Sequence, residues 1–394
     1  MPELVYLDNA ATTKMLPEVL DAMMPYLTDK YGNPSSIHSF GASCNAACDE
    51  ARKKVASVIN AKENEIYFTA GGTESDNWAL KSVAYMKKSK GKHIITSAIE
   101  HHAIFETCEF LARDGFEITF VGVDDKGIIK MDELKAAIRQ DTILISVMYA
   151  NNEIGTIQPI REIGALARSK GILFHTDAVQ AYGHIPIDVE ADNIDLLSAS
   201  AHKLHGPKGV GMLYMKNNIK LTPFIHGGAQ ERNRRAGTMN VPGIVGFGKA
   251  AEIAKKNMAA NGAKLKEMNY YLMDKILKEI PFSKLNGDRD KRLPGSVNIS
   301  FRFIEGESML MMVDMKGVAA STGSACASGS LDPSHVLLAI GLPHEIAHGS
   351  IRLTMSEDTT KKDLDYTVGV LKEVVSKLRA MSPLYEDAVR RKEA

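Results

Sequence analysis

The sequence lacks most of the features that would place it outside ordinary globular proteins. Four cysteines in 394 residues are too few for the disulfide framework of a small secreted protein. The 48 basic residues balance 48 acidic ones, so no net charge favours nucleic acid as the main partner. No apolar run approaches the length that spans a bilayer, and the start, MPELVYLDNAATT, has no signal-peptide pattern. We therefore expect a cytoplasmic protein without direct nucleic-acid or membrane contacts.

The length and the order of apolar patterns predict two domains. A chain of 394 residues, 44% hydrophobic and 24% charged, is longer than one typical core needs. Strands alternate with helical patterns over residues 65–215, which is typical of a mostly parallel, doubly wound sheet. Residues 244–280 show helical spacing, and residues 294–393 mix strands and helices. We expect an α/β protein with a large domain, 16–258, and a smaller α+β domain made of 1–15 and 259–394.

An acid and a lysine each follow an apolar run in the middle of the chain. The run 171–174 leads to Asp177, with Gln180 one turn later, and the run 194–201 leads to Lys203. In an open α/β sheet, ligands bind beyond the carboxyl ends of the strands. A lysine amine forms a Schiff base with a carbonyl, and pyridoxal phosphate (PLP) sites also pair an acid with the pyridinium nitrogen. Each residue alone has a structural alternative, a turn cap or a solvated side chain, but together they predict a PLP site.

Several polar residues near this pair are candidates for the phosphate of such a cofactor. Gly72 and Thr73 join a strand to a helix, where free amide N–H groups and the helix dipole favour an anion. The alternative is that Thr73 only caps the helix. Ser200 and His202 lie just before Lys203 in sequence. Lys208 competes with Lys203, but its position between proline and glycine predicts an exposed turn.

Cys326 lies in a run of small residues, STGSACASGS at 321–330. Loops of this kind carry reactive groups, so the thiol is a candidate nucleophile whose reactivity depends on its pKa. The alternative is an incidental surface cysteine. Cys44 and Cys48 have a spacing that metal sites use, but buried thiols that pack like small apolar groups are the preferred interpretation.

The segment HEIAH at 344–348 matches the zinc-protease motif H-E-x-x-H. Pro343 precedes it and Gly349 follows it, so a helix there is about two turns at most. A third histidine of the extended motif is absent. We therefore expect no metal, and zinc-protease activity is a remote alternative.

Taken together, the motifs resemble the cysteine desulfurases of the class V (fold-type I) PLP enzymes, close to the NifS/IscS group. The resemblance covers nearly the whole chain, and in combination its motifs are highly specific. They are YLDNAATT at 6–13, GTESDN at 72–77, Glu100-His101, NNEIG at 151–155, HTDAVQ at 175–180, SAHK at 200–203, RAGT at 235–238, SAC at 324–326 and SIR at 350–352. Thr322 and Ala327 depart from the family's usual loop, which puts loop behaviour in doubt and leaves the cysteine in place.

The resemblance implies a role for each matching residue. Lys203 would hold PLP, Asp177 would pair with the ring nitrogen, Gln180 would bond the phenolic oxygen, and His101 would stack on the ring and act as an acid or base. Phosphate contacts would come from Gly72, Thr73, Ser200 and His202, and from Thr238 of the other subunit of a homodimer. Arg352 and Asn152 would bind the substrate carboxylate, and Asn152 would also contact the cofactor.

The resemblance also implies the reaction. L-cysteine would become L-alanine, with Lys203 taking the α-proton and Cys326 receiving the sulfur as a persulfide. The sulfur would then pass to an iron–sulfur scaffold protein or another acceptor for cluster assembly or thiolation. Alternatives are a class V aminotransferase, a selenocysteine lyase, or a non-catalytic partner in iron–sulfur assembly.

Overall fold

The structure, a computed structural model, describes residues 4–322, 333–386 and 388. Its largest sheet has the strand order β2-β8-β7-β6-β5-β3-β4, and every neighbouring pair is parallel except the two that involve β8. The strands are β2 (Ile66–Thr69), β3 (His93–Ser97), β4 (Glu117–Val121), β5 (Thr142–Ser146), β6 (Leu173–Asp177), β7 (Leu196–Ser200) and β8 (Gly211–Met215). The predicted mostly parallel, doubly wound sheet is confirmed.

Helices cover both faces of this sheet because successive strand residues point to opposite sides. Tyr67 packs with Trp78 of one apolar cluster, whereas its neighbour Phe68 packs with Phe247 of the other. The first face carries α3 (Gly72–Lys87) and α4 (His102–Arg113), and the second carries α2 (Ser39–Ser57), α6 (Ile160–Ser169) and part of α8 (Val241–Glu279). Helix α1 (Pro17–Thr28) lies along α8, and α5 (Met131–Ala137) lies beside β4.

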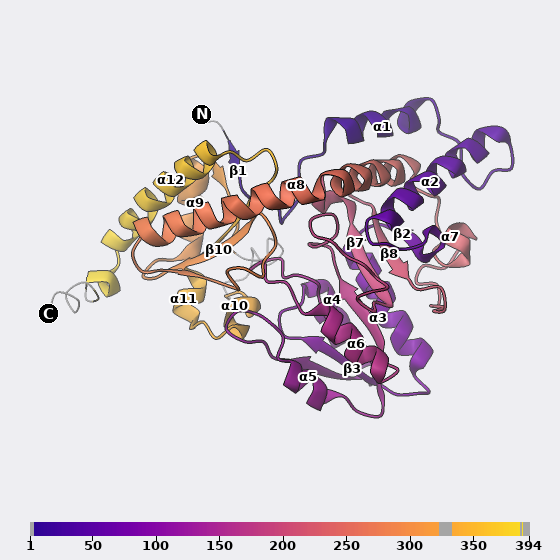
Figure 1. Ribbon diagram of the computed structural model, residues 1–394, viewed down its shortest axis with the longest axis horizontal. Helices are drawn as coiled ribbons and strands as arrows, with labels where there is room; N and C mark the ends of the chain where they lie inside the picture. The colour runs from indigo at the N-terminus through magenta and orange to yellow at the C-terminus, as the bar shows by residue number, and fades with distance from the viewer. Residues whose placement is uncertain (1–3, 323–332, 387, 389–394) are drawn as a thin grey trace.

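A second apolar core lies at the other end of α8 (Figure 1). It surrounds a three-stranded antiparallel sheet, β12-β10-β9, together with helices from the last third of the chain. The elements are β9 (Ser283–Leu285), β10 (Ser296–Phe301), α9 (Gly306–Met315), β12 (Ser350–Thr354) and α12 (Lys361–Ala380). Two short helices, α10 (His335–Ala339) and α11 (His344–His348), pack instead in a smaller apolar cluster with Ile99 and Met148, which follow β3 and β5. The domain boundaries given above stay a prediction.

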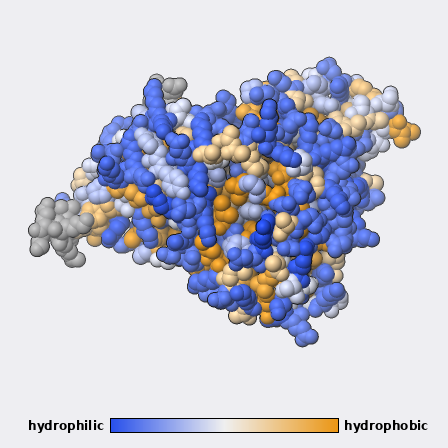
Figure 2. Space-filling view, in the orientation of Figure 1, coloured by the Kyte–Doolittle hydropathy of each residue, from blue (hydrophilic) through white to orange (hydrophobic). Residues whose placement is uncertain are grey.

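The start of the chain joins this second core. Strand β1 (Val5–Tyr6) pairs in parallel with β11 (Val318–Ala319), and Leu7 is fully buried. Helix α8 runs through both cores, with Phe247 buried in the first and Ile276 buried in the second. The exposed face seen in Figure 2 is mostly hydrophilic, with apolar residues gathered toward its middle. None of the helices in the described part of the chain is both long and apolar enough to cross a membrane.

Candidate active site

The two loops singled out in the sequence meet at one edge of the large sheet. Strand β6 ends at Asp177, and β7, its parallel neighbour, ends at Ser200 and continues into a 3-10 turn, Ala201–Lys203. Parallel pairing places the carboxyl ends of both strands side by side. The positive charge of Lys203 acts on both Asp177 and His101. The structure therefore brings together the predicted lysine, acid and histidine.

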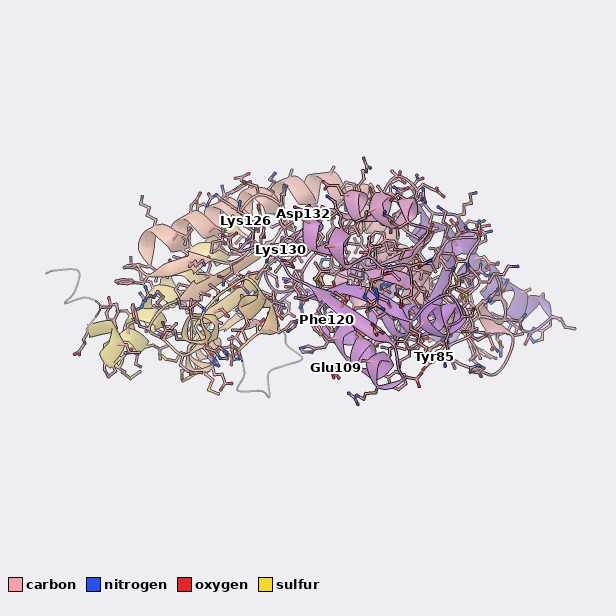
Figure 3. All side chains as sticks on the ribbon, turned by 90° about the horizontal axis from the view of Figure 1, so that it is seen from below. Tyr85, Glu109, Phe120, Lys126, Lys130 and Asp132 are labelled. Carbon is pink, nitrogen blue, oxygen red and sulfur yellow. The ribbon has the colours of Figure 1, made fainter. Side chains whose placement is uncertain are left out.

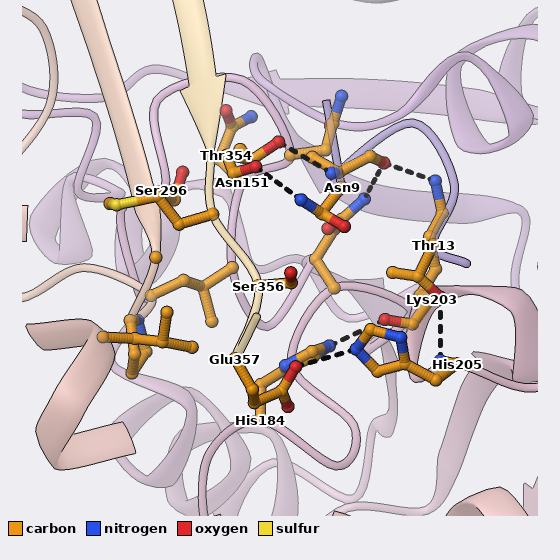
Figure 4. A pocket seen from close by; sticks show the side chains of 18 residues that line it. Asn9, Thr13, Asn151, His184, Lys203, His205, Ser296, Thr354, Ser356 and Glu357 are labelled. Atoms are coloured by element: carbon orange, nitrogen blue, oxygen red, sulfur yellow. Dashed lines mark hydrogen bonds and ion pairs between the residues drawn. The ribbon is translucent and has the colours of Figure 1, made fainter. Parts of the chain in front are cut away.

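The Lys203 amine is held by the backbone near the start of the chain. Its Nζ donates to the carbonyl oxygens of Ala10 (2.5 Å) and Ala11 (2.9 Å). Gln180 Nε2 donates to the same Ala10 oxygen at 3.0 Å. Figure 4 shows Lys203 beside Asn9 and Thr13 in a pocket that Gln180 also lines. By contrast, Lys208 is exposed, as its turn predicted.

Asp177 is a buried acid with few partners of its own. Its Oδ1 accepts a hydrogen bond from the Val179 N–H at 2.9 Å. Burial raises its pKa to about 6, against the lowering effects of the Val179 N–H and the Lys203 charge. Asp76 lies close enough to interact with it, and burial followed by the Asp177 charge raises the pKa of Asp76 as well. This arrangement favours a cation beside Asp177, since a buried carboxylate is stable only when paired.

Two histidines near the lysine are neutral at physiological pH. His101 precedes α4 and its Nδ1 accepts from the Ala103 N–H at 3.1 Å. Burial, and then the Lys203 charge, lowers the pKa of His101 to about 4. The same two causes lower the pKa of His202 to about 4, and its Nδ1 lies 3.2 Å from Thr12 Oγ1. A neutral imidazole at position 101 can accept a proton from a reacting group.

The loop before α3 has the properties of an anion site. Helix α3 begins at Gly72, and its first amide N–H groups have no partners within the helix. A Cβ at Gly72 would lie 2.5 Å from Val179 Cγ2, so a larger residue there would have to displace the Val179 side chain. A Cβ on Gly71 would lie 3.9 Å from Ser200 Oγ, which places that hydroxyl at the loop. Thr73 lies inside the first turn and does not cap the helix, so the capping alternative is wrong.

The segment that carries Thr238 is fastened to this loop. Arg235 forms a bidentate ion pair with Glu74 in the first turn of α3, at 2.9 and 3.0 Å. Upstream, Glu231 and the next two residues have left-handed backbone conformations, with φ of 43°, 57° and 60°. Buried Glu231 accepts from both terminal nitrogens of Arg52 (2.8 Å each) and from the Phe68 N–H (2.9 Å). Thr238 itself is exposed.

Arg352 and Asn152 lie together, but Asn152 contributes its backbone. Arg352 Nη1 donates to the Asn152 carbonyl at 3.0 Å, and Arg352 Nη2 donates to Asp8 Oδ1 at 2.8 Å. The Arg352 side chain is 2% exposed, and its Nε has no hydrogen-bond partner in the described residues. Sequence reasoning missed Asp8, although it is part of the quoted motif YLDNAATT.

Three buried ionisable residues behind the site were also missed. Glu100 accepts from Ser97 Oγ and from the Met148 N–H, and burial raises its pKa to about 8. Burial lowers the pKa of His175 to about 3, and its Nε2 lies 3.7 Å from Asp76 Oδ1. Glu100, His175 and Asp76 all belong to quoted motifs, so the signal was present but no chemistry had been assigned to it.

Cys326 lies outside the described residues. The other three cysteines, Cys44, Cys48 and Cys108, are buried, which confirms the packing interpretation for the first two. The HEIAH segment forms the short helix α11, which leads directly into β12. Nowhere in residues 4–322 and 333–386 do three His, Cys, Asp or Glu side chains gather as a metal ion would require.

The sequence matches the class-V aminotransferase family over residues 5–367. It is 54% identical over 395 residues to a cysteine desulfurase IscS of Clostridium botulinum, with 100% of both chains covered. Among solved structures, a NifS-like protein has a TM-score of 0.90 and 38% identity, covering 95% of this chain and 100% of its own. A structure titled SspA in complex with cysteine has a TM-score of 0.81 and 36% identity, covering 90% of this chain and 100% of its own.

Fold, site and similarity therefore define a PLP-dependent enzyme of the class-V aminotransferase family. Within that family, the chain belongs with the cysteine desulfurases of the IscS and NifS-like group.

The residues present fit the cofactor. Buried Asp177 needs a cationic partner such as a protonated ring nitrogen. The amides of α3 and the Ser200 hydroxyl form a cradle for a phosphate. Lys203 has the amine that a covalent link to the cofactor would need.

Proposed function

We propose that this enzyme converts L-cysteine to L-alanine and transfers the sulfur to Cys326. One observation carries the proposal: Lys203, Asp177 and His101 meet at the sheet edge, and Cys326 is available in the same chain. An aminotransferase needs the first three residues but has no use for the thiol.

The cofactor residues divide the task of holding PLP. Lys203 would hold it covalently, Asp177 would pair with its ring nitrogen, and Gln180 would bond its phenolic oxygen. Gly72, Thr73, Ser200 and His202 would bind its phosphate, and Asn152 would line the same site. When bound, PLP supplies an electron sink that accepts the charge left after the α-proton is removed.

The chain's own groups then move protons and sulfur. Arg352, held beside Asn152, would bind the substrate carboxylate and orient the α-carbon. Lys203 would take the α-proton, and neutral His101 would serve as a further acid or base near the ring. The Cys326 thiolate would attack the substrate sulfur, so that a new S–S bond forms as the substrate C–S bond breaks. The bonding pair stays with carbon and is protonated, which yields alanine and the Cys326 persulfide.

A homodimer would complete the site. Thr238 is exposed on a segment fastened to the phosphate loop through Arg235 and Glu74, which suits a residue that contacts the partner's phosphate. Exposed apolar side chains on α1, Leu20, Met24 and Leu27, recur at helical spacing and offer a face for a second copy.

The sulfur would leave the enzyme for a protein acceptor in the cytoplasm. An iron–sulfur scaffold protein is the favoured acceptor because curated relatives carry the name IscS, and thiolation pathways are the other candidates. A reducing compartment suits an enzyme whose three described cysteines are buried and unpaired.

The test measures sulfide and alanine from L-cysteine and a reductant, with and without candidate scaffold proteins. Cys326→Ala should keep the absorbance of bound PLP and lose sulfide release. Full sulfide release by this variant would refute sulfur transfer through Cys326, whereas amino-group transfer to a keto acid would favour the aminotransferase alternative.

A further inference from the structure

The segment 8–13 touches the catalytic groups, yet the proposed reaction gives it no role. Asn9 Nδ2 donates to the Thr354 carbonyl at 2.8 Å, which ties the segment to β12. Ala10 accepts from both Lys203 and Gln180 on the other side. Figure 4 shows Asn9 between Thr354 and Lys203. The segment therefore links the strand that carries Arg352 to the turn that carries the lysine.

Asp8 begins this segment and is the ionic partner of Arg352. Its Oδ1 accepts from Arg352 Nη2 at 2.8 Å and from Ser321 Oγ at 2.9 Å. The Asp8 side chain is 18% exposed and that of Arg352 is 2% exposed, so the pair is largely removed from water. Ser321 also exchanges backbone hydrogen bonds with Arg352. The carboxylate is thus held in place by a second, uncharged donor.

The contacts described above use only some of the N–H donors of Arg352. A guanidinium has five N–H donors, and Asp8 and the Asn152 carbonyl take two of them. The unpartnered, buried Nε shows that part of the fork still lacks an acceptor. In the proposed reaction, a substrate carboxylate would take the remaining donors. It would meet an arginine whose charge is already balanced, with a second carboxylate a few ångströms away.

We propose that Asp8 is a positioning residue that orients Arg352 and weakens its hold on carboxylates, so that the amino-acid product can leave. The proposal rests on the assignment of Arg352 as the carboxylate-binding residue. Asp8 touches neither substrate nor reacting atoms; it acts through the guanidinium. Its competition affects substrate and product alike, because both carry the same carboxylate.

The substitution Asp8→Asn removes the negative charge of Asp8 and can keep its hydrogen-bond geometry. The amide oxygen of asparagine can still accept from Arg352 and Ser321, but the negative charge is gone. We expect the holoenzyme variant to bind 3-mercaptopropionate, which has the carboxylate and thiol of cysteine but no amine, about tenfold more tightly, or about 1.4 kcal/mol. Binding of cysteamine, which has no carboxylate, should not change. Isothermal titration calorimetry gives both constants.

Steady-state kinetics give a second reading. The KM for L-cysteine should fall, and L-alanine should become a stronger product inhibitor, with no gain in kcat. A purely structural role would lower kcat and affect both probes equally. Asp132→Asn is the matched control, because Asp132 lies on the surface at α5 (Figure 3) and its side chain is fully exposed. It should leave every constant unchanged.

The outcomes distinguish this inference from the proposed function. Unchanged or weaker 3-mercaptopropionate binding by Asp8→Asn overturns the role of Asp8. If Arg352→Lys also leaves carboxylate binding unchanged, the assignment of Arg352 itself fails. Should Asp8→Asn not fold, Ser321→Ala, which frees the carboxylate from its second donor and keeps its charge, should shift carboxylate affinity without altering cysteamine binding. No shift in that variant overturns the proposal as well.

Discussion

The buried ion pair between Arg52 and Glu231 offers a sharp test of how the phosphate side of the site is held. Both residues are 6% exposed, and two 2.8 Å hydrogen bonds join them. Glu231→Gln removes the charge and one acceptor. Arg52 keeps the Ile66 carbonyl at 2.9 Å, the Phe68 ring at 4.6 Å and the half-exposed Asp49 carboxylate at 3.9 Å, but it loses its buried bidentate partner. Breaking such a pair costs about 3–5 kcal/mol.

The loss in free energy of unfolding can also be obtained from the hydrogen bonds that the substitution weakens. Hydrogen bonds to charged groups contribute about 1.5–3 kcal/mol each, and the substitution weakens two, so this route gives at most about 3–6 kcal/mol, which overlaps the first range. The left-handed backbone at Glu231 and its two successors then loses its anchor. We therefore also expect weaker retention of PLP, because the segment that leads to Thr238 is displaced.

The assay is urea unfolding followed by the fluorescence of Trp78, the single tryptophan of the sequence. This residue is fully buried, and its indole N–H donates to the Thr222 carbonyl at 2.8 Å. Arg52→Met should be similarly destabilising, and the double variant with Glu231→Gln should lose clearly less than the sum. Arg139→Met, which breaks exposed ion pairs with Glu117 and Asp141, should be far less destabilising, because solvent screens exposed pairs. Additive losses, or a loss below about 1 kcal/mol for Glu231→Gln, would refute the reasoning.

Three further predictions follow from the site. Lys203→Ala should be purified without covalently held cofactor, so borohydride treatment should leave no reduced PLP attached to the chain in mass spectrometry; attachment elsewhere would contradict the assignment. Asp177→Asn should retain the lysine link, seen by absorbance, yet lose activity by about 10²-fold or more, and near-normal turnover would exclude a role for the charge. His205 donates to Glu357 at 2.8 Å. Burial alone would lower the pKa of His205 and raise that of Glu357, but this hydrogen bond and the opposite charges outweigh it, so the pKa of His205 is raised and that of Glu357 falls from 4.5 to about 2. Ionised Glu357 contributes fully to the free energy of unfolding above pH 4.5, and protonated His205 contributes fully below pH 6.5. His205→Gln should therefore lower the free energy of unfolding most between these two pH values. The difference in stability between the wild type and His205→Gln should shrink as the pH rises through the raised pKa of His205. Thermal melts that show a larger difference at alkaline pH would contradict the ion pair.

The parts of the fold set by local pattern were predictable from sequence. Strands β6 and β7 are short apolar runs that end in polar residues, so their ends and the edge they share could be expected. Strand β8 was not foreseen as an antiparallel insertion between β7 and β2. Its glycine- and proline-rich approach reads as a loop, and strand order depends on contacts far apart in sequence.

In the candidate site, too, some residues could be predicted from the sequence and some contacts could not. Lys203, Asp177 and His101 belong to motifs that point to their chemistry. Asp8 could not be connected to Arg352, because 344 residues separate them and only the folded chain brings them to 2.8 Å. Asn152 was expected to help Arg352 bind the substrate carboxylate, which stays a prediction. That its backbone carbonyl accepts a hydrogen bond from Arg352 could not be expected, because residue type does not reveal backbone contacts.

Helix α8 has a mechanical consequence for sulfur delivery. Its 39 residues form a continuous rod of about 58 Å, with side chains fixed in both apolar cores. Any wide opening between the two halves would have to bend or break that rod, at the expense of its backbone hydrogen bonds. The two halves should therefore keep their relative orientation throughout the catalytic cycle. The acceptor protein proposed above would then approach two halves whose relative orientation is fixed.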